Sequence, residues 1–190
     1  MNFRKIKIAL EVVYGNIFLR KKVFGIGLPK TGQTSLATAM RIIGYHVVQY
    51  PYFDYQIKSN NFAIDIPVAL RYKELDKQFP NSKFILTTRK HKPWLKSIKN
   101  HYRNNPARKR HPAILKYREL FWGTIHFNQK IMTKTYYKHN QEVVEYFKNR
   151  KRDLLVLDVD SPNKWKKICT FLSKDVPSIK YPNENIGKYI

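Results

Sequence analysis

The chain has 190 residues, close to the usual size of one domain, so we expect a single domain over residues 1–190. Hydrophobic residues make up 43% of the sequence and only 7 residues are glycine, which excludes a disordered, collagen-like or low-complexity chain. The 37 lysines and arginines against 13 acidic residues give a formal net charge of +24, which favours partners that carry phosphate or other anionic groups.

The positive charge is concentrated in the middle of the chain. No acidic residue stands between Asp76 and Glu119, whereas lysines and arginines recur throughout that segment. We expect the segment to form an electropositive face of the protein. Most of its charges are expected to be solvated, because single surface charges rarely have an assigned role.

The two ends of the chain differ from the expected core, which covers residues 22–185. Residues 1–21 are basic with an apolar middle, and we expect an N-terminal helix that covers the core, with contact to a membrane surface as the alternative. Glu11 and Asn16 interrupt the apolar stretch, so we expect neither a signal peptide nor a membrane-spanning helix. Cys169 is the only cysteine, which predicts a buried thiol and a reducing, cytoplasmic compartment.

The first third of the chain alternates short apolar runs with one helical pattern. Val23–Gly27 is expected to be a strand and Thr34–Ile43 a helix, because apolar residues recur at helical spacing in the second segment. His46–Gln49 reads as a second strand. Pro51–Asn61, rich in aromatic and polar residues, is expected to be a loop of the kind that borders a site, and Ala63–Ile66 a further short strand.

The middle of the chain continues the alternation. Pro67 suits the first turn of a helix that we expect over Val68–Phe79. Lys83–Thr88 is the clearest strand, since its centre is continuously apolar, as in sheets covered on both faces. Pro93–Tyr102 predicts another helix, and residues 113–151 predict either one long helix or two antiparallel helices.

The last elements complete an α/β pattern. Leu154–Val159 predicts a strand, and Asp160 or Ser161 is expected to cap a helix over Asn163–Leu172, with an irregular tail over residues 177–190. The alternation predicts a three-layer α/β fold with a mainly parallel sheet of four or five strands and helices on both faces.

A glycine-bordered loop follows the first predicted strand. Gly27-Leu-Pro-Lys-Thr-Gly-Gln-Thr34 has the glycine spacing of a phosphate-binding loop, in which backbone N–H groups and a helix N-terminus surround an anion. Gln33 stands where such loops carry a lysine, and Lys30 lies inside the loop instead. This departure disfavours an ordinary ATPase or GTPase, and a tight turn without a ligand is the alternative.

The same residues resemble those of sulfotransferases that use 3′-phosphoadenosine 5′-phosphosulfate (PAPS). The loop of that family has the form Pro-Lys-x-Gly-x-[Ser/Thr], and here Pro29-Lys-Thr-Gly-Gln-Thr34 follows it. In the family a strand ends in an arginine with a serine eight residues later, and here KFILTTRKHKPWLKS contains Arg89 and Ser97. FAIDIPVALRYKELDKQFP and NKWKKICTFLSKDVPSIKYPNEN resemble segments of a small single-domain branch, so the similarity spans about Lys22 to Asn185.

The resemblance implies a P-loop-like sulfotransferase fold and roles for particular residues. It implies a site for the 5′-phosphosulfate at Lys30, Thr31, Gly32, Gln33, Thr34 and Ser35, and a site for the 3′-phosphate at Arg89 and Ser97. Ser35 stands where many members carry an aromatic residue that stacks on adenine, so adenine needs another partner. The Arg-Lys-Gly segment of some members is missing, and Lys188 is only a weak replacement.

Sulfuryl transfer requires a cation beside the leaving group and a base beside the acceptor. Lys30 can supply the cation, no metal is expected, and an arginine such as Arg89 can bind a phosphate bidentately. Asp65, at a strand-to-helix junction, is one candidate base, although it could simply cap the helix. His46 is the second candidate, with a structural role as its alternative. Two further histidines in the basic segment, His91 and His101, are expected only to add positive charge.

Three functions follow from these patterns. The first is a PAPS-dependent sulfotransferase that acts on a hydroxyl or an amine. The second is a P-loop kinase of small molecules or nucleotides that uses Lys30, and the third is a non-catalytic protein of the same fold that binds polyanions. The net charge favours an acidic acceptor, a glycan or a small molecule, and no recognised nucleic-acid motif is present, so we do not expect nucleic acid as a partner. The oligomeric state stays open.

Overall fold

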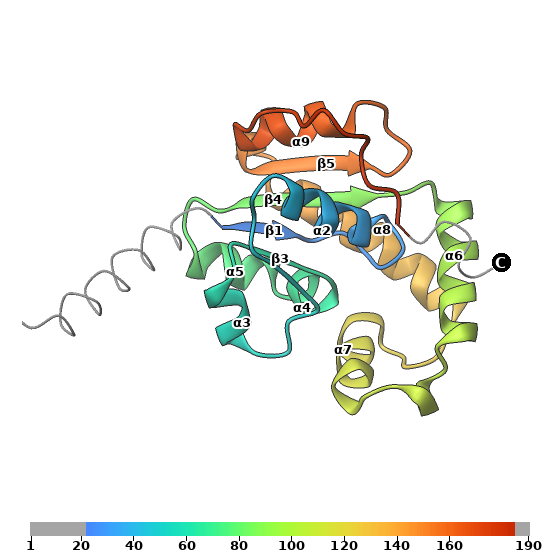
Figure 1. Cartoon of the computed structure of the whole chain (residues 1–190). Helices are drawn as coiled ribbons and strands as arrows, with labels where there is room; N and C mark the ends of the chain where they lie inside the picture. Colours follow the sequence, from blue (N-terminus) through green and yellow to red (C-terminus); the bar gives the residue numbers. More distant parts are fainter. Residues whose placement is uncertain (1–21, 185–190) are drawn as a thin grey trace, which may run out of the picture.

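The computed structural model describes residues 22–184, and its centre is a five-stranded parallel sheet. The strands are β1 (Val23–Gly25), β2 (Val47–Gln49), β3 (Phe62–Ile64), β4 (Lys83–Thr88) and β5 (Leu154–Asp158). They are arranged in the order β2-β3-β1-β4-β5, and every neighbouring pair is parallel (Figure 1). All carboxyl ends therefore lie at one edge of the sheet, and the predicted parallel sheet of four or five strands is confirmed.

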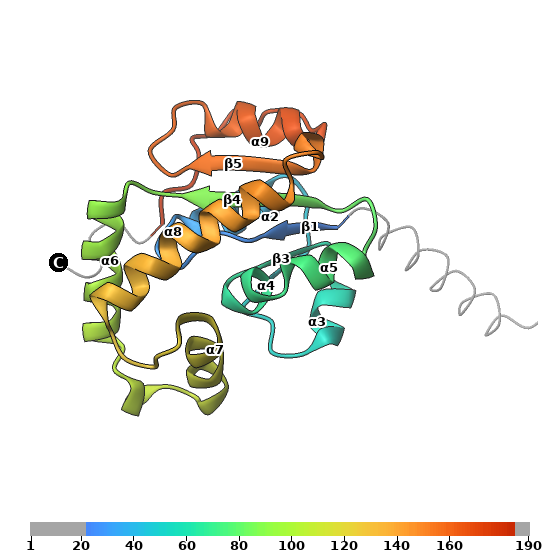
Figure 2. The same cartoon turned by 180° about the vertical axis from the view of Figure 1, so that it is seen from behind.

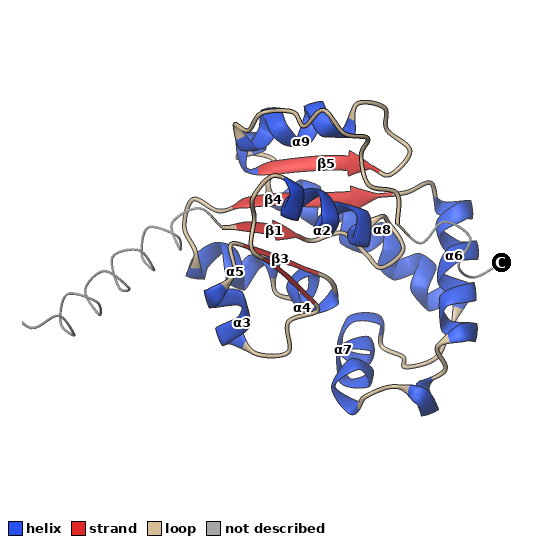
Figure 3. Ribbon diagram, in the orientation of Figure 1, coloured by secondary structure: helices blue, strands red, loops and turns tan. Residues whose placement is uncertain are grey.

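Helices cover both faces of the sheet. On one face lie α2 (Gln33–Ile42) and α9 (Lys164–Leu172); on the other lie α4 (Ile66–Leu70), α5 (Tyr72–Gln78) and α8 (Gln129–Tyr146). Figures 1 and 2 show α2 and α8 on opposite sides of the strands, and Figure 3 shows the same three layers by element type. The predicted three-layer α/β fold is confirmed.

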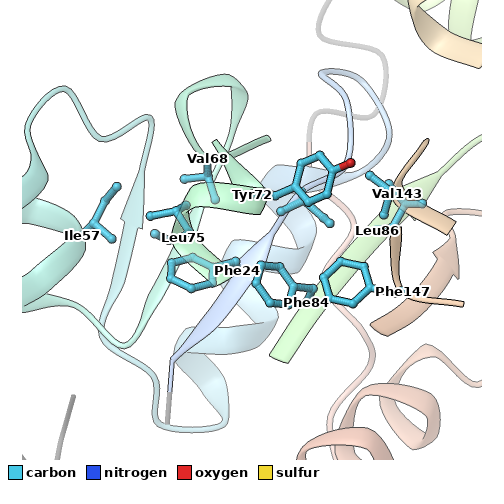
Figure 4. Close-up of a cluster of buried hydrophobic side chains, with 11 residues drawn as sticks. Phe24, Ile57, Val68, Tyr72, Leu75, Phe84, Leu86, Val143 and Phe147 are labelled. Atoms are coloured by element: carbon cyan, nitrogen blue, oxygen red, sulfur yellow. The ribbon is translucent and has the colours of Figure 1, made fainter. Parts of the chain in front are cut away.

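The core follows from the alternation of side chains along the strands. Phe24 and Phe84 point to the face covered by α8, and their ring centroids lie 5.4 Å apart. Phe147, just after α8, continues this row at 4.8 Å from Phe84 (Figure 4). Val23 and Ile85 point to the opposite face, where they pack with α2 and α9. Both sheet faces are therefore buried, as continuously apolar parallel strands require.

A third apolar cluster lies beyond the carboxyl ends of the strands. It joins α6 (His91–Asn104), α7 (Pro112–Trp122) and α8, and Figure 1 shows α6 across the end to which the strand arrows point. Trp94 is fully buried in it, and its ring lies 4.3 Å from that of Tyr136. This cluster holds α6 and α7 in place at the edge where loops of parallel sheets form sites.

The segment expected as a loop over Pro51–Asn61 contains a helix, α3 (Asp54–Ser59), so that prediction was wrong. Gln56 closes the first turn, because its side-chain oxygen accepts hydrogen bonds from the backbone N–H groups of Tyr52 (2.8 Å) and Phe53 (3.1 Å). The sequence did not indicate this helix, because the aromatic residues around the turn do not form an apolar stripe at helical spacing. Phe53, for example, is 62% exposed.

A buried lysine connects α3 to the start of the sheet. Lys22 donates hydrogen bonds from Nζ to the carbonyl oxygens of Ile57 (2.6 Å), Lys58 (3.0 Å) and Asn60 (2.6 Å). These carbonyls lie at the C-terminal end of α3, where a positive charge is favourable. Lys22 thereby fixes α3 beside β1.

One helix expected to be continuous is interrupted, and of the two alternatives for residues 113–151 the structure shows two separate helices. The segment Val68–Phe79 forms α4 and α5, which meet at Arg71. Arg71 is held outward there by Asp54 and Glu74, each at 2.7 Å. Residues 113–151 form α7 and α8 rather than one helix, because Gly123 ends α7 in a left-handed conformation (φ 72°).

The predicted cap of the last helix was wrong. The helix α9 begins at Lys164, after Asn163, and no side chain caps it. Asp160 and Ser161 belong instead to a turn after β5, where their backbone N–H groups bind the side chain and the carbonyl of Asp158 at 2.7 and 3.0 Å. The turn delays the start of the helix.

Some expectations concern residues outside the described range. The N-terminal helix over residues 1–21 and the comparison with Lys188 both lie there. Within residues 22–184, no helix combines the length and the apolar character that a membrane crossing needs. Cys169 is fully buried, as predicted, in a small cluster with Trp165 and Ala39.

Candidate active site

A cavity of about 870 Å³ opens at the carboxyl edge of the sheet. The residue that directly follows each of four strands lines it, namely Tyr50 after β2, Asp65 after β3, Arg89 after β4 and Val159 after β5. The fifth contribution is the loop after β1, with every residue from 29 to 35. Open parallel sheets form ligand sites at this edge, so the topology itself assembles the site.

The loop after β1 is held by hydrogen bonds that turn two of its side chains inward. The Thr31 hydroxyl donates to the Leu28 carbonyl at 2.6 Å and shares a second hydrogen bond of 2.6 Å with the Thr87 hydroxyl. Gln33 is also buried, and its Nε2 donates to the carbonyl of Gly27. The side chains of Thr31 and Gln33 are therefore used to hold the loop in shape.

The N-terminus of α2 points an uncapped helix end at the cavity. Gly32 is the N-cap residue with φ 91°, no side chain caps the helix, and its first turn contains no acidic residue. Thr34 is exposed, whereas the Ser35 hydroxyl accepts a hydrogen bond from the backbone N–H of Glu184 at 2.9 Å. Free N–H groups and the positive end of the helix dipole together favour an anion here.

Two cations border this helix end. Arg89 donates from Nη1 to the carbonyl of Lys30 at 3.4 Å, and Tyr136 donates to the carbonyl of Arg89. Arg89 Nε is buried without a hydrogen-bond partner in residues 22–184. Burial lowers the pKa of Lys30, and the nearby charge of Arg89 lowers it further. Ser97, on α6, lines the same cavity. Two neighbouring cations with an unpaired donor are suited to bind an anion.

Across the cavity, Asp65 combines a helix cap with a perturbed carboxyl group. It is the N-cap residue of α4 with φ 99°, and its Oδ1 accepts the backbone N–H of Ile66 at 3.0 Å. Burial raises the pKa of Asp65 to about 6, and the hydrogen bond from Ile66 opposes this rise. Burial, followed by the charge of Asp65, raises the pKa of Tyr50, which places these two groups close together. A carboxyl group with this pKa is ionised at neutral pH and is basic enough to take a proton.

The structure does not bring His46 to the cavity. It is exposed at the amino end of β2, the edge opposite the site, where its backbone N–H donates to Asn61 Oδ1 at 2.7 Å. His91 interacts with the Thr133 hydroxyl at 3.2 Å and is not a lining residue either.

His101 lines the cavity, and its expected positive charge is a prediction that was wrong. Burial, followed by the charges of Lys30, Arg118 and Arg110, lowers its pKa to about 4. The imidazole is therefore neutral at physiological pH. In the described part of the chain, no group of three His, Cys, Asp or Glu residues could hold a metal ion.

Three lining residues adopt left-handed backbone conformations that side chains normally avoid. The φ angles are 70° at Lys30, 54° at Tyr50 and 99° at Asp65. Such conformations cost on the order of 1–3 kcal/mol each and concentrate at functional sites. Their positions after β1, β2 and β3 indicate that the edge is shaped for a ligand.

Sequence reasoning missed several lining residues. Tyr50, Arg110, Arg118 and Tyr181 all contribute to the cavity. The two arginines lie in the basic segment, but nothing in their spacing separates them from the exposed cations beside them. Tyr181 could have been found, because it lies in the C-terminal stretch that resembles the family, and it is the aromatic residue nearest in sequence to the Pro-x-x-Asn motif.

Together, the parallel sheet and the loop that leads from β1 into α2 define an α/β protein of the P-loop-like type. A family model described as a sulfotransferase domain matches residues 49–190, which is most of the chain. The chain therefore belongs to the sulfotransferase domain family, whose members are transferases of sulfuryl groups. The match includes Asp65, Arg89 and Ser97 but begins after the loop that carries Lys30, so the loop supports the assignment independently. No curated protein matches the chain.

Proposed function

We propose that the protein transfers a sulfuryl group from PAPS to a hydroxyl or amine of an acceptor. The observation that carries the proposal is the position of Lys30 and Arg89, which border one cavity at the uncapped N-terminus of α2. The unpaired buried donor Arg89 Nε and the anion-binding end of α2 fit a ligand with two phosphate groups. The volume of about 870 Å³ leaves room for an acceptor beside a nucleotide.

The proposed nucleotide half of the cavity lies over β1, β4 and β5. The loop residues 30–35 would bind the 5′ end, and Arg89 with Ser97 would bind the 3′-phosphate. Tyr181 lines this half and is held by an edge-to-face contact with Trp165 at 5.3 Å, so it can supply the adenine contact that Ser35 cannot. PAPS, when bound, supplies the sulfuryl group and a good phosphate leaving group.

Lys30 and the N-terminus of α2 stabilise the negative charge that develops on the leaving phosphate oxygen. The bond from sulfur to that oxygen breaks as the acceptor oxygen or nitrogen forms its bond to sulfur, and the electron pair stays on the phosphate. Fixed donors directed at such a charge typically contribute about 3–4 kcal/mol each to lowering the barrier. Because Lys30 and the helix end are fixed by the fold, they need little reorganisation during the reaction.

Asp65 is the proposed base that takes the acceptor proton. It lies after β3, on the side of Lys30 away from Arg89 in the strand order, so it can face the sulfur opposite the leaving group. His46 lies at the far edge of the sheet, which favours Asp65 between the two candidates. With a pKa of about 6, Asp65 is ionised at neutral pH and becomes neutral when it accepts the proton.

Nucleotide binding tests the cofactor half of the proposal. Calorimetric titration should show that adenosine 3′,5′-bisphosphate binds at least about tenfold more tightly than adenosine 5′-monophosphate, because one charge-assisted pair is worth about that factor. Arg89→Lys should reduce this difference, since lysine cannot bind a phosphate bidentately. Lys92→Met, which removes an exposed charge outside the cavity, is the matched control. Equal affinity for the two nucleotides would contradict the proposed 3′-phosphate site.

Group transfer tests the reaction. Purified protein with isotope-labelled PAPS should label an acceptor pool, and Lys30→Met should lower the rate by about 10²–10³-fold, as expected for loss of one fixed donor. Labelled ATP is the matched donor for the kinase alternative. Transfer from ATP but not from PAPS would replace the proposal with a P-loop kinase, and equal rates for wild type and Lys30→Met would remove the assigned role of the loop.

A further inference from the structure

We propose that Arg110 and Arg118 form a subsite that binds an oxyanion of the acceptor, so that the acceptor is an acid whose reactive group lies beside Asp65. This inference rests on the proposed sulfuryl transfer and names the class of acceptor for the same cavity. The subsite is the part of the cavity wall that the segment around α7 supplies. Its function differs from that of Arg89 and Ser97, which serve the nucleotide.

Arg118 is a buried cation whose contacts within the protein are weak. It is only 3% exposed, yet it lines the cavity. Its two terminal nitrogens approach the carbonyl of Asn105 at 3.4 and 3.5 Å, which is long for hydrogen bonds from a guanidinium. The guanidinium also lies over the ring of Tyr102, with 4.2 Å to the centroid. Stacking on Tyr102 fixes the plane of the group and leaves its donors available.

Arg110 lies beside Arg118 and increases the positive charge. It lines the same cavity, and its Nε is buried without a hydrogen-bond partner in the described residues. Burial lowers the pKa of Arg118, and the charge of Arg110 contributes to the same shift. The neutral His101 lies near both arginines and offers a hydrogen-bonding group that does not add to their repulsion.

No carboxylate in residues 22–184 lies within 4.0 Å of either arginine. A buried arginine is unfavourable unless an opposite charge compensates it, and a second arginine without a carboxylate partner beside it increases the need for one. By contrast, Arg71 and Arg150 elsewhere in the molecule both have carboxylate partners. The missing counter-charge is therefore expected to come from a ligand in the cavity.

The position of the pair relative to Asp65 assigns that ligand to the acceptor. Tyr50 connects the two groups: its pKa responds to the charges of both Asp65 and Arg118, and its hydroxyl donates to the carbonyl of Ile114 on α7 at 3.4 Å. The helices α4 and α7 are in direct contact, so the segment that carries Arg118 packs against the helix that Asp65 caps. An acid bound by Arg110 and Arg118 would thus present its hydroxyl near the proposed base. Tyr50 and Ile114 would line its apolar body.

A matched pair of probes tests the subsite without the chemical step. Protein saturated with adenosine 3′,5′-bisphosphate is titrated by calorimetry with 4-hydroxybenzoate and with its methyl ester, which lacks the negative charge. The acid should bind at least about tenfold more tightly than the ester, a low value for a bidentate charge-assisted pair. Arg110→Met should abolish that preference. Arg108→Met, which removes an exposed arginine outside the cavity two residues away, should leave it unchanged.

A second variant covers the case in which the buried position does not tolerate change. Arg118→Lys keeps the charge but removes the fork of donors, so the acid should bind several-fold more weakly while the ester and the bisphosphate bind as before. Absence of acid binding, equal binding of acid and ester, or an equal loss in Arg108→Met and Arg110→Met would overturn the inference. If the bisphosphate itself fails to bind, the proposed function fails. The same titrations with the acid and the ester on the nucleotide-free protein then still test whether Arg110 and Arg118 bind the acid in preference to the ester.

Discussion

The hydroxyl of Thr31 offers a sharp test of how the loop after β1 is held. Thr31 is fully buried, and its hydroxyl donates to the Leu28 carbonyl, so the hydrogen bond with Thr87 must have Thr87 as the donor. Thr31→Val keeps the volume of the side chain and removes both interactions. Each hydrogen bond contributes about 1 kcal/mol, and the Thr87 hydroxyl left unpaired adds about 1 kcal/mol. We therefore expect the free energy of unfolding to fall by about 2–3 kcal/mol.

Urea unfolding followed by circular dichroism measures this change from the shift in midpoint at constant slope. Thr34→Val is the matched control, because Thr34 is exposed in the first turn of α2 and the same substitution should cost less than about 0.5 kcal/mol of stability there. The double variant Thr31→Val with Thr87→Val should cost less than the sum of the single variants, since they remove one shared hydrogen bond. Equal midpoints for Thr31→Val and Thr34→Val would refute the assigned hydrogen bonds.

Three further predictions concern the base, the loop and the buried lysine. Because burial raises the pKa of Asp65 to about 6 and its ionised form is the proposed base, kcat/KM should fall about tenfold per pH unit below pH 6 and level off above it. A profile of kcat/KM that stays flat down to pH 5 would contradict the assignment. The free energy of unfolding of the wild type, compared with that of Asp65→Asn, should also increase as the pH falls from 6 towards 4, because the folded protein then binds one more proton than the unfolded protein. Gly27→Ala places a Cβ atom 1.9 Å from Thr87 Oγ1 and 2.6 Å from the Thr87 carbonyl oxygen. Thermal unfolding should therefore show that the protein loses about 3 kcal/mol of stability, whereas an unchanged midpoint would show that β4 can move to make room. Lys22→Met removes the donor for three carbonyl groups and should lower the free energy of unfolding in urea by about 2 kcal/mol. Amide hydrogen exchange in α3 should become faster, and unchanged exchange there would show that other contacts hold α3.

The strands and the loop were predictable from sequence because their signals are local. Lys83–Thr88 is a strand with the predicted bounds, and the glycines around Lys30 do mark a turn between a strand and a helix. Parallel strands place their carboxyl ends together, so the alternation alone sufficed to expect Arg89 and Asp65 at one edge. These predictions needed no information on tertiary packing.

The rest depended on contacts between distant segments. His46 is an exception, because it precedes β2 and the start of a parallel strand lies at the edge opposite the cavity, so the sequence already contained the reason to exclude it. Arg118 cannot be told from exposed cations such as Lys116 by composition or by period, because its burial follows from the packing of α7 on α4 and α6. The neutral state of His101 likewise depends on neighbours that the chain brings in from the loop and from α7.

The two halves of the cavity are carried by different kinds of chain segment. Lys30 and Arg89 follow the central strands β1 and β4, so any change in their surroundings disturbs the sheet itself. Arg110 and Arg118 lie between α6 and α8, in a stretch that contributes no strand. Under the proposed assignment, substitutions in that stretch would change which acceptor is modified and would leave the donor site intact.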